Sequence, residues 1–146
     1  MYDFKILNPG DDISLAIALR KDVFCDEQGY SHSDEFDDLD NSSTHVLVFD
    51  KAENILISYG RIIDEGNGVF RLGRICVKKS FRSKHIGQNL MLFMIDFVKA
   101  NGGNLILIGA QIRVKGFYES LGFEAYDDVY MDVHVPHIKM KLVCNI

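Results

Sequence analysis

Residues 69–97, VFRLGRICVKKSFRSKHIGQNLMLFMIDF, contain the most informative pattern for the fold. A β-rich run ends at Val77, a basic loop follows, and apolar residues then recur with the spacing of an amphipathic helix. The next apolar run, Leu105–Ile108, indicates a strand on the far side of this helix. Because a helical crossover joins the two strands, we expect them to pair in parallel.

The segments before this stretch predict further strands and one helix. Tyr2–Leu7 alternates as a short strand does, and apolar residues from Ile13 to Phe24 follow helical spacing. His45–Asp50 and Ile55–Ile63 are β-rich, and short turns join them to each other and to the central run. This order predicts an antiparallel meander that leads into the central strand.

The segments after the central stretch predict a short helix and a last strand. Val114, Phe117 and Leu121 share one helical face, and Gly122 is suited to end that helix. Ile138–Val143 alternates again as a strand does. We therefore expect an α+β fold in which one mixed, mostly antiparallel sheet carries helices on its faces.

Length and composition predict one soluble domain, residues 1–146. Of the 146 residues, 47% are hydrophobic and 25% are charged, and no repeat or Pro/Gly-rich linker divides the chain. Apolar runs are far shorter than the roughly 20 residues of a membrane helix, and no signal-peptide pattern opens the chain, so we expect a cytoplasmic protein without a membrane partner. Cys25, Cys76 and Cys144 lack metal-ligand spacing, so we expect reduced thiols and no metal site.

Charge is distributed unevenly along the chain. The net charge of −5 argues against a nucleic-acid partner, because phosphate neutralisation needs a basic surface. Between Asp26 and Asp40 there are seven acids and no Lys or Arg, which indicates either a solvated loop or a surface that attracts cations. Between Arg71 and Ile95 there are six cations and no acid. These two segments predict an anionic ligand at one site and a cationic ligand nearby.

The basic loop Lys78–Gly87 runs into the predicted N-terminus of a helix. Unpaired backbone N–H groups and the helix dipole favour phosphate or pyrophosphate there, although a solvated basic turn has the same composition. The chain contains neither a G-x-x-x-x-G-K-[ST] motif nor a G-x-G-x-x-G motif, so nucleotide hydrolysis and Rossmann-type dinucleotide binding lose their sequence support. The loop therefore predicts another kind of phosphate carrier as its ligand.

Three motifs follow one another along the second half of the chain: RICV at 74–77, RSKHIG at 82–87 and FYESLGF at 117–123. In this order of strand, loop and helices, they resemble the GNAT N-acetyltransferase family. Four further segments resemble the ElaA-like branch of that family: VFCDEQ at 23–28, HVL at 45–47, AQ at 110–111 and VPHIKM at 135–140. The resemblance covers essentially the whole chain.

The resemblance implies direct transfer of an acetyl group from acetyl-coenzyme A (acetyl-CoA) to a primary amine. It also implies a sheet splayed between the strands at 69–77 and 105–110, with helices on both faces and the pantetheine arm paired with backbone in the opening. The residues that it places against the acetyl-CoA donor are Ile75, Cys76, Val77, Arg82, Ser83, Lys84, His85, Ile86, Gly87, Gln88 and Gln111.

Two of these donor-site residues have open interpretations. His85 stands where the family's phosphate loop has glycine, which normally permits a close approach of backbone to phosphate. His85 either keeps its N–H for phosphate and adds a donor, or it crowds the loop and weakens binding. Gln111 either positions the acetyl end or caps its helix.

The resemblance also suggests the acid and the base of the reaction. Tyr118 matches the family's general acid, whose hydroxyl protonates or hydrogen-bonds the departing thiolate. An amine with a lysine-like pKa of ~10.4 costs about 4.6 kcal/mol to deprotonate at pH 7, so a base is useful. Glu27 is the first candidate for this base, and His45 and His137 are the alternatives.

Two other functions are compatible with the same sequence. One is a non-catalytic coenzyme A binding or sensing module on the same fold, which the departure at His85 motivates. The other is an interaction domain without a ligand, in which the basic loop is only a solvated surface. For the enzyme, we expect the acceptor to be an amine of a small molecule or of a protein, and the protein to be a monomer or a homodimer.

Overall fold

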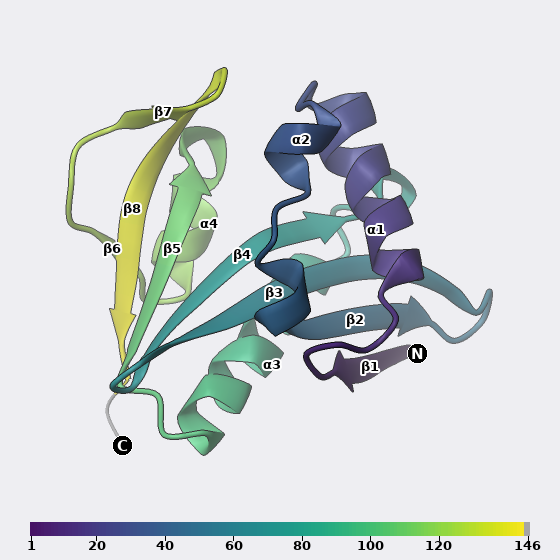
Figure 1. The fold of residues 1–146 in the computed structure, drawn as a ribbon, viewed down its shortest axis with the longest axis horizontal. Coiled ribbons are helices and arrows are strands. Elements are labelled where there is room, and N and C mark those ends of the chain that lie inside the picture. Colours follow the sequence, from purple (N-terminus) through teal and green to yellow (C-terminus); the bar gives the residue numbers. More distant parts are fainter. Residues whose placement is uncertain (145–146) are drawn as a thin grey trace.

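The backbone of residues 1–144, the part of the chain that the computed structural model describes, forms one eight-stranded mixed sheet (Figure 1). The strands lie in the order β1-β2-β3-β4-β5-β8-β6, and β7 pairs with β8 outside this row. Their bounds are β1 (Tyr2–Leu7), β2 (Thr44–Asp50), β3 (Ile55–Gly66), β4 (Val69–Val77), β5 (Leu105–Gln111), β6 (Glu124–Ala125), β7 (Tyr130–Asp132) and β8 (Val135–Val143). Among these strands only β4 and β5 pair in parallel, so the expected mixed, mostly antiparallel sheet is confirmed.

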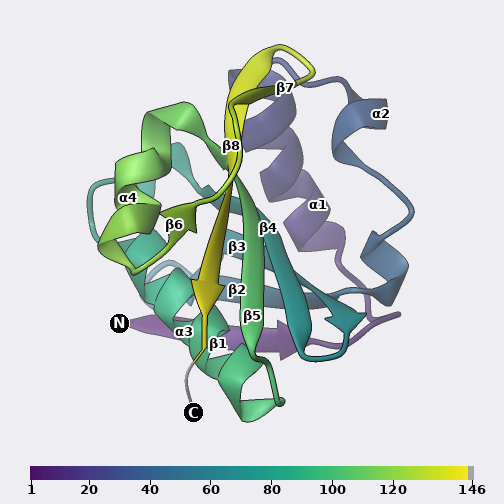
Figure 2. The ribbon, with the colours of Figure 1, turned by 90° about the vertical axis from the view of Figure 1, so that its left-hand side faces the viewer.

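Helices cover both faces of this sheet. The α-helices of the described residues are α1 (Ser14–Arg20), α2 (His32–Glu35), α3 (Ile86–Ala100) and α4 (Lys115–Ser120). Figure 2 shows α3 and α4 on one side of the sheet and α1 and α2 on the other. The helix expected from Ile13 to Phe24 begins as α1 and continues as a π-helical segment, Lys21–Glu27. Because π-helical turns often occur at functional sites, we expect the end of this segment to be part of a site.

The sheet is splayed between β4 and β5, as the resemblance implies. The two strands pair in parallel only from Val69–Leu105 to Arg71–Leu107 and then diverge (Figure 1). Beyond this point β4 continues beside β3, and β5 continues beside β8. The β5-facing edge of β4 is therefore left without a strand partner from Leu72 to Val77 within the described residues.

A β-bulge in β4 accompanies the divergence of the two strands. Arg74 has a φ of +55° and lies where the register with β3 shifts, between the pairs Cys76–Tyr59 and Gly73–Arg61. Bulges bend a strand and increase its twist, which accounts for the departure of β4 from β5 close to this point. Gly73, directly before Arg74, is the local sequence signal for the bulge, because an isolated glycine inside a strand often marks one.

The splayed sheet is held by a core on each face. On one face α3 buries Leu90, Met91, Met94 and Val98 completely. Gly60 in β3 allows this close packing, because a Cβ at that position would lie 2.5 Å from the sulfur of Met94. A second hydrophobic cluster lies on the other face, under α1 and the π-helical segment. Packing on both faces keeps the two walls of the opening in place.

The main helices and strands lie where the sequence predicts them, but several of their ends differ from the prediction. The strand expected to begin at Ile138 begins at Val135, and the strand expected to end at Ile63 runs on to Gly66. The short strands β6 and β7 were not expected. These two short segments form strands because each pairs with the long strand β8. The local sequence does not reveal this partner. No helix within residues 1–144 is long and apolar enough to cross a membrane.

Candidate active site

A cleft of about 610 Å³ fills the opening between β4 and β5. Its walls come from these two strands, from α4, from β7 and β8, and from the end of the π-helical segment. A second hollow of about 310 Å³ lies at the start of α3. The two cavities share Val77, Arg82, Ser83, Gly87 and Phe117, so a long ligand can run from the start of α3 into the cleft.

The loop before α3 presents backbone N–H groups to the second hollow. The N–H groups of Ile86, Gly87 and Gln88 have no acceptor within residues 1–144, as expected for the first turn of a helix. The loop contains no Asp or Glu, and Lys84 adds a positive charge directly after Ser83. The free donors and the positive end of the helix dipole suit a phosphate or pyrophosphate.

His85 has a backbone conformation that glycine adopts more easily than any other residue. It is the residue before the first turn of α3, and its φ of +61° lies in the left-handed region that favours glycine. Histidine is one of the residues that tolerate this region better than most. Its side chain is exposed and makes no capping hydrogen bond, and His85 is among the residues that line the second hollow.

Arg82 and Glu27 form a two-pronged ion pair at the mouth of the cleft. The two terminal nitrogens of Arg82 donate to the Glu27 carboxylate over 2.8 and 2.9 Å, and Arg82 Nε donates to the carbonyl of Val77 over 3.0 Å. The hydrogen bonds from Arg82 lower the pKa of Glu27. The residue expected to hold phosphate and the residue expected to act as base are thus each other's partners.

Tyr118 enters the cleft from α4. Its ring is 8% exposed and packs edge-to-face against Phe117 and Phe123. Burial raises the pKa of its hydroxyl to about 12. Within residues 1–144 this hydroxyl forms no hydrogen bond, and it is not among the fully enclosed polar atoms, so it is available to a ligand in the cleft.

His137 and His45, the two alternative bases, lie in different surroundings. His137 lines the cleft opposite Gln111, and its Nδ1 donates to the carbonyl of Val135 over 2.9 Å, which leaves Nε2 of the neutral ring as an acceptor. His45 is 1% exposed, and both of its ring nitrogens are occupied, by Tyr59 and by the backbone of Asp40. His45 therefore cannot reach an acceptor amine, whereas His137 can.

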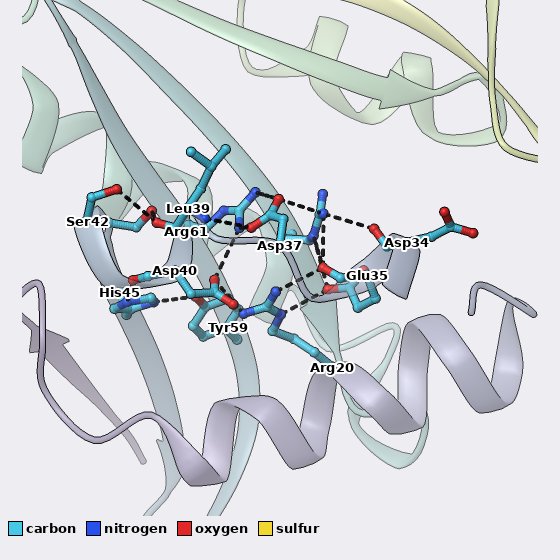
Figure 3. A network of polar contacts seen from close by, with 12 residues as sticks. Arg20, Asp34, Glu35, Asp37, Leu39, Asp40, Ser42, His45, Tyr59 and Arg61 are labelled. Carbon is cyan, nitrogen blue, oxygen red and sulfur yellow. Dashed lines mark hydrogen bonds and ion pairs between the residues drawn. The ribbon is translucent and has the colours of Figure 1, made fainter. Parts of the chain in front are cut away.

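The acidic stretch 26–40 is neither a solvated loop nor a cation-attracting surface over its central part. Glu35, Asp37 and Asp40 point inward to three arginines, one each from α1, β3 and β4 (Figure 3). The pairs are Arg20 with Glu35 and Asp40, Arg61 with Asp37 and Asp40, and Arg74 with Glu35 and Asp37, over 2.7–3.2 Å. Three positive and three negative charges balance, so this network adds no net charge to the cleft.

Gln28 connects the π-helical segment to the other wall of the cleft. Its side-chain carbonyl accepts a hydrogen bond from Gln111 over 2.8 Å, and its backbone carbonyl accepts one from His134 over 2.6 Å. Gln111 in turn accepts from Arg113 over 2.9 Å. The chain position of Gln28 next to Glu27 is the one sequence signal that could have singled it out, because the pair ends the VFCDEQ motif.

Two further features limit the chemistry of the site. Cys76 lines the cleft but is 4% exposed, and its burial raises the pKa of the thiol, so it stays protonated and is a poor nucleophile. No cluster of three or more potential metal-ligating side chains is present in the described part of the chain. The cleft lining also contains Tyr30, Tyr130 and Asp132, which the sequence did not single out. Residues 124–134 show no regular pattern, and Tyr30 lies just beyond the predicted helix.

Comparisons with known proteins agree on one family. The family model for the acetyltransferase (GNAT) domain matches residues 21–144. The uncharacterized N-acetyltransferase YjcF of Bacillus subtilis is 30% identical over 126 residues, which are 86% of this chain and 88% of YjcF. Protein ElaA of Escherichia coli is 31% identical over 128 residues, 85% of this chain and 82% of ElaA.

Solved structures show the same architecture. The crystal structure of Escherichia coli ElaA matches with a TM-score of 0.85 and 27% identity and covers 97% of this chain and 99% of its own. An acyl-CoA N-acyltransferase from Pseudomonas aeruginosa matches with the same TM-score at 24% identity, again over 97% and 99% of the two chains.

Proposed function

This chain belongs to the GNAT acetyltransferase family, and we propose that it transfers an acetyl group from acetyl-CoA directly to a primary amine in the cleft between β4 and β5. The family uses acetyl-CoA as its donor substrate, and the chain is an acyltransferase. The observation that carries the proposal is the continuity of the two cavities. One end is the free N-terminus of α3, and the other contains the unoccupied hydroxyl of Tyr118.

The donor fits this shape in two parts. Its pyrophosphate meets the free N–H groups at the start of α3, where Ser83 and Gln88 line the same hollow and Lys84 follows Ser83 in the chain. Its pantetheine arm carries amide groups that can pair with the unpartnered edge of β4 at Ile75–Val77, as an added strand does. Acetyl-CoA is consumed in the reaction, so it is a substrate of the site and not a resident group.

Tyr118 is the group that we assign to the departing thiolate. A hydroxyl whose pKa is about 12 gives up its proton less readily than an ordinary phenol. It therefore acts first as a hydrogen-bond donor to the sulfur as negative charge develops there, and a dry site makes such a bond strong. Its lack of any other partner among residues 1–144 means that no existing hydrogen bond has to break.

The base stays a prediction with two candidates. Glu27 is ionised at neutral pH, but its pairing with Arg82 lowers its pKa and makes it a weak proton acceptor while the pair persists. His137 offers a free Nε2 to the cleft, and its Nδ1–H is already held by the carbonyl of Val135. The geometry favours His137 over Glu27 for taking the proton, with Glu27 positioning Arg82 and the end of the π-helical segment.

The transfer proceeds without an acyl-enzyme in this proposal. The neutral amine attacks the thioester carbonyl carbon, a C–N bond forms, and the tetrahedral intermediate then loses the C–S bond. The amine nitrogen gives up its protons to the base and to water, and the thiolate takes a proton from Tyr118, which water restores. The protonated, buried thiol of Cys76 supports direct transfer, because no activated nucleophile is at hand.

Calorimetric titration of acetyl-CoA, followed by thiol release with a panel of primary amines, tests the proposal. Micromolar binding, about −8 kcal/mol, together with amine-dependent thiol release is the expected result. Binding without release from any amine would favour the non-catalytic coenzyme A module. If acetyl-CoA does not bind, both the acetyltransferase and the non-catalytic coenzyme A module are excluded.

A further inference from the structure

Some charged side chains that line the cleft pair with an opposite charge, and others do not. The cleft contains five arginines, and four of them have carboxylate partners: Arg61, Arg71, Arg74 and Arg82. The fifth, Arg113, hydrogen-bonds Gln111 near Tyr118. Within residues 1–144 Arg113 has no carboxylate partner, and the other cations of the basic loop precede the start of α3.

The end of the cleft beside β7 contains carboxylates without a cation. Asp132, which ends β7, has no Arg or Lys partner within residues 1–144, and its side chain is 47% exposed. Asp34 at the same end accepts a hydrogen bond from Ser31 and likewise has no cationic side chain as partner among these residues. Glu35, the remaining acid of the lining, belongs to the balanced arginine network. This end of the cleft therefore carries net negative charge.

Aromatic rings line the surroundings of Asp132. Tyr130 lies over β5, where a Cβ on Gly109 would be 2.5 Å from its hydroxyl oxygen, and Tyr30 faces it from the segment after the π-helical turn. Burial is the main cause that raises the pKa of both tyrosines, to about 12 for Tyr30, and the Asp132 charge is the next cause in each. In Figure 1, β7 and α2 face each other across the open end of the splayed sheet.

We propose that Asp132, Tyr30 and Tyr130 form an ammonium-binding subsite that selects an acceptor with a cationic alkylamine and without a carboxylate beside it. A carboxylate next to tyrosine rings suits an alkylammonium, because the charge meets Asp132 while the alkyl chain and the cation meet the ring faces. An anionic substituent would meet the two carboxylates that lack a cationic partner, and Arg71 and Arg74, the arginines whose charges act on the two tyrosines, already have carboxylate partners. This inference rests on the proposed function, since the subsite holds that reaction's acceptor.

The subsite also places the amine beside the candidate base. Asp132 Oδ2 lies 3.7 Å from Nε2 of His137, the nitrogen that carries no proton in the neutral ring. An ammonium bound to Asp132 can pass one proton to this nitrogen, and the imidazolium that forms is then stabilised by the same carboxylate. The amine is left neutral, with its lone pair free to attack the thioester carbon.

The test uses small probes on the full chain, so it requires neither turnover nor the true acceptor. Butylammonium, 1-butanol and butyrate have similar chains and differ in charge. Each is titrated into labelled protein by NMR while the ring signals of Tyr30, Tyr130 and His137 are followed. We expect butylammonium to shift these signals at the lowest concentration, butanol at a higher one, and butyrate not at all.

Variants separate the subsite from general surface charge. Asp132→Asn is expected to weaken butylammonium binding about tenfold, and Asp132→Glu to restore part of it. Asp127→Asn is the matched control, because Asp127 is an exposed carboxylate on the same connection and pairs with Lys139 over 3.9 Å. Circular dichroism checks that each variant folds.

Three outcomes would overturn the inference: butyrate shifting the same signals as strongly as butylammonium, Asp132→Asn binding butylammonium like the parent chain, or Asp127→Asn losing as much affinity as Asp132→Asn. The probe result is independent of the proposed function. Loss of acetyl-CoA binding and thiol release with ammonium binding intact would remove the enzyme reading and with it the acceptor role of the site, and the reverse result would remove only the subsite.

Discussion

Arg82 and Glu27, 55 positions apart in the chain, meet in a bidentate ion pair at the mouth of the cleft. The pair joins the end of the π-helical segment to the loop that follows β4, and Arg82 also holds the last carbonyl of that strand, at Val77. Because the guanidinium is committed in this way, the backbone N–H groups at the start of α3 are the donors left free for phosphate. We therefore expect acetyl-CoA binding to depend more on the shape of this loop than on the charge of Arg82.

Replacing Tyr118 with phenylalanine should separate chemistry from binding. Tyr118→Phe keeps the ring packing against Phe117 and Phe123 and removes only the hydroxyl. We expect kcat to fall about 100-fold and the Kd for acetyl-CoA to stay within about twofold. Steady-state kinetics and calorimetry check the two halves of this expectation, and an unchanged kcat would remove Tyr118 from the mechanism.

The two candidate bases can be compared with matched variants. We expect His137→Gln to lower kcat by about 100-fold, because the free Nε2 that faces the cleft is lost. Glu27→Gln keeps a hydrogen-bond partner for Arg82 and should lower kcat less than about tenfold if Glu27 only positions that side chain. The reverse order of the two effects, at unchanged acetyl-CoA affinity, would make Glu27 the base.

The Glu27–Arg82 pair should contribute to stability only above acidic pH. Its hydrogen bonds lower the pKa of Glu27 in the folded protein, so the contribution is present above the ordinary glutamate value of about 4.3 and is lost as pH falls through the lowered folded value. Both side chains are partly exposed, so we expect at most about 1 kcal/mol. Urea unfolding of the parent and of Glu27→Gln at pH 7 and pH 3 should show a difference at pH 7 that shrinks at pH 3.

The phosphate loop should tolerate a glycine in place of His85. His85→Gly relieves the left-handed backbone at φ +61°, and we expect a gain of up to about 1 kcal/mol in the free energy of unfolding. Acetyl-CoA affinity should change by less than about threefold, because the imidazole is exposed and the binding donors are backbone groups. A loss of affinity greater than tenfold would instead show that the His85 side chain itself holds the phosphate.

Breaking the buried arginine network should destabilise the whole fold. Arg20 is fully buried and is the partner of Glu35, which is 3% exposed, so Arg20→Met leaves a buried carboxylate short of one cation. We expect a loss of about 3–5 kcal/mol in chemical unfolding. Lys115→Met, which breaks the exposed pair with Glu119, is the control and should cost less than about 1 kcal/mol.

Much of the fold and part of the site could be predicted from local patterns. The run that ends at Val77, the basic loop and the helix that follows it all lie within one continuous stretch, so periodicity and composition suffice to identify them. The parallel pairing of β4 with β5 follows from the helical crossover between them. The anion-binding character of the loop follows from its position before a helix.

Contacts between distant segments decided the rest. In the sequence Glu35, Asp37 and Asp40 are part of a stretch typical of a solvated loop or a cation-attracting surface, but in the fold they pair with three arginines from α1, β3 and β4. Likewise His45 and His137 are equally plausible bases in the sequence, and only packing buries the first and turns the second toward the cleft.

The order of the elements, the parallel crossover and the position of the basic loop before a helix could thus be predicted from the sequence, because each depends on residues that are close together in the chain. Only tertiary contacts show which charges are neutralised, that Glu27 pairs with Arg82, and that Asp132, which has no Arg or Lys partner within residues 1–144, lies close to His137 and lines the same cleft as two tyrosines. These features depend on side chains that come from separate elements, and their charge and burial are set only when the splayed sheet brings those elements to one cleft.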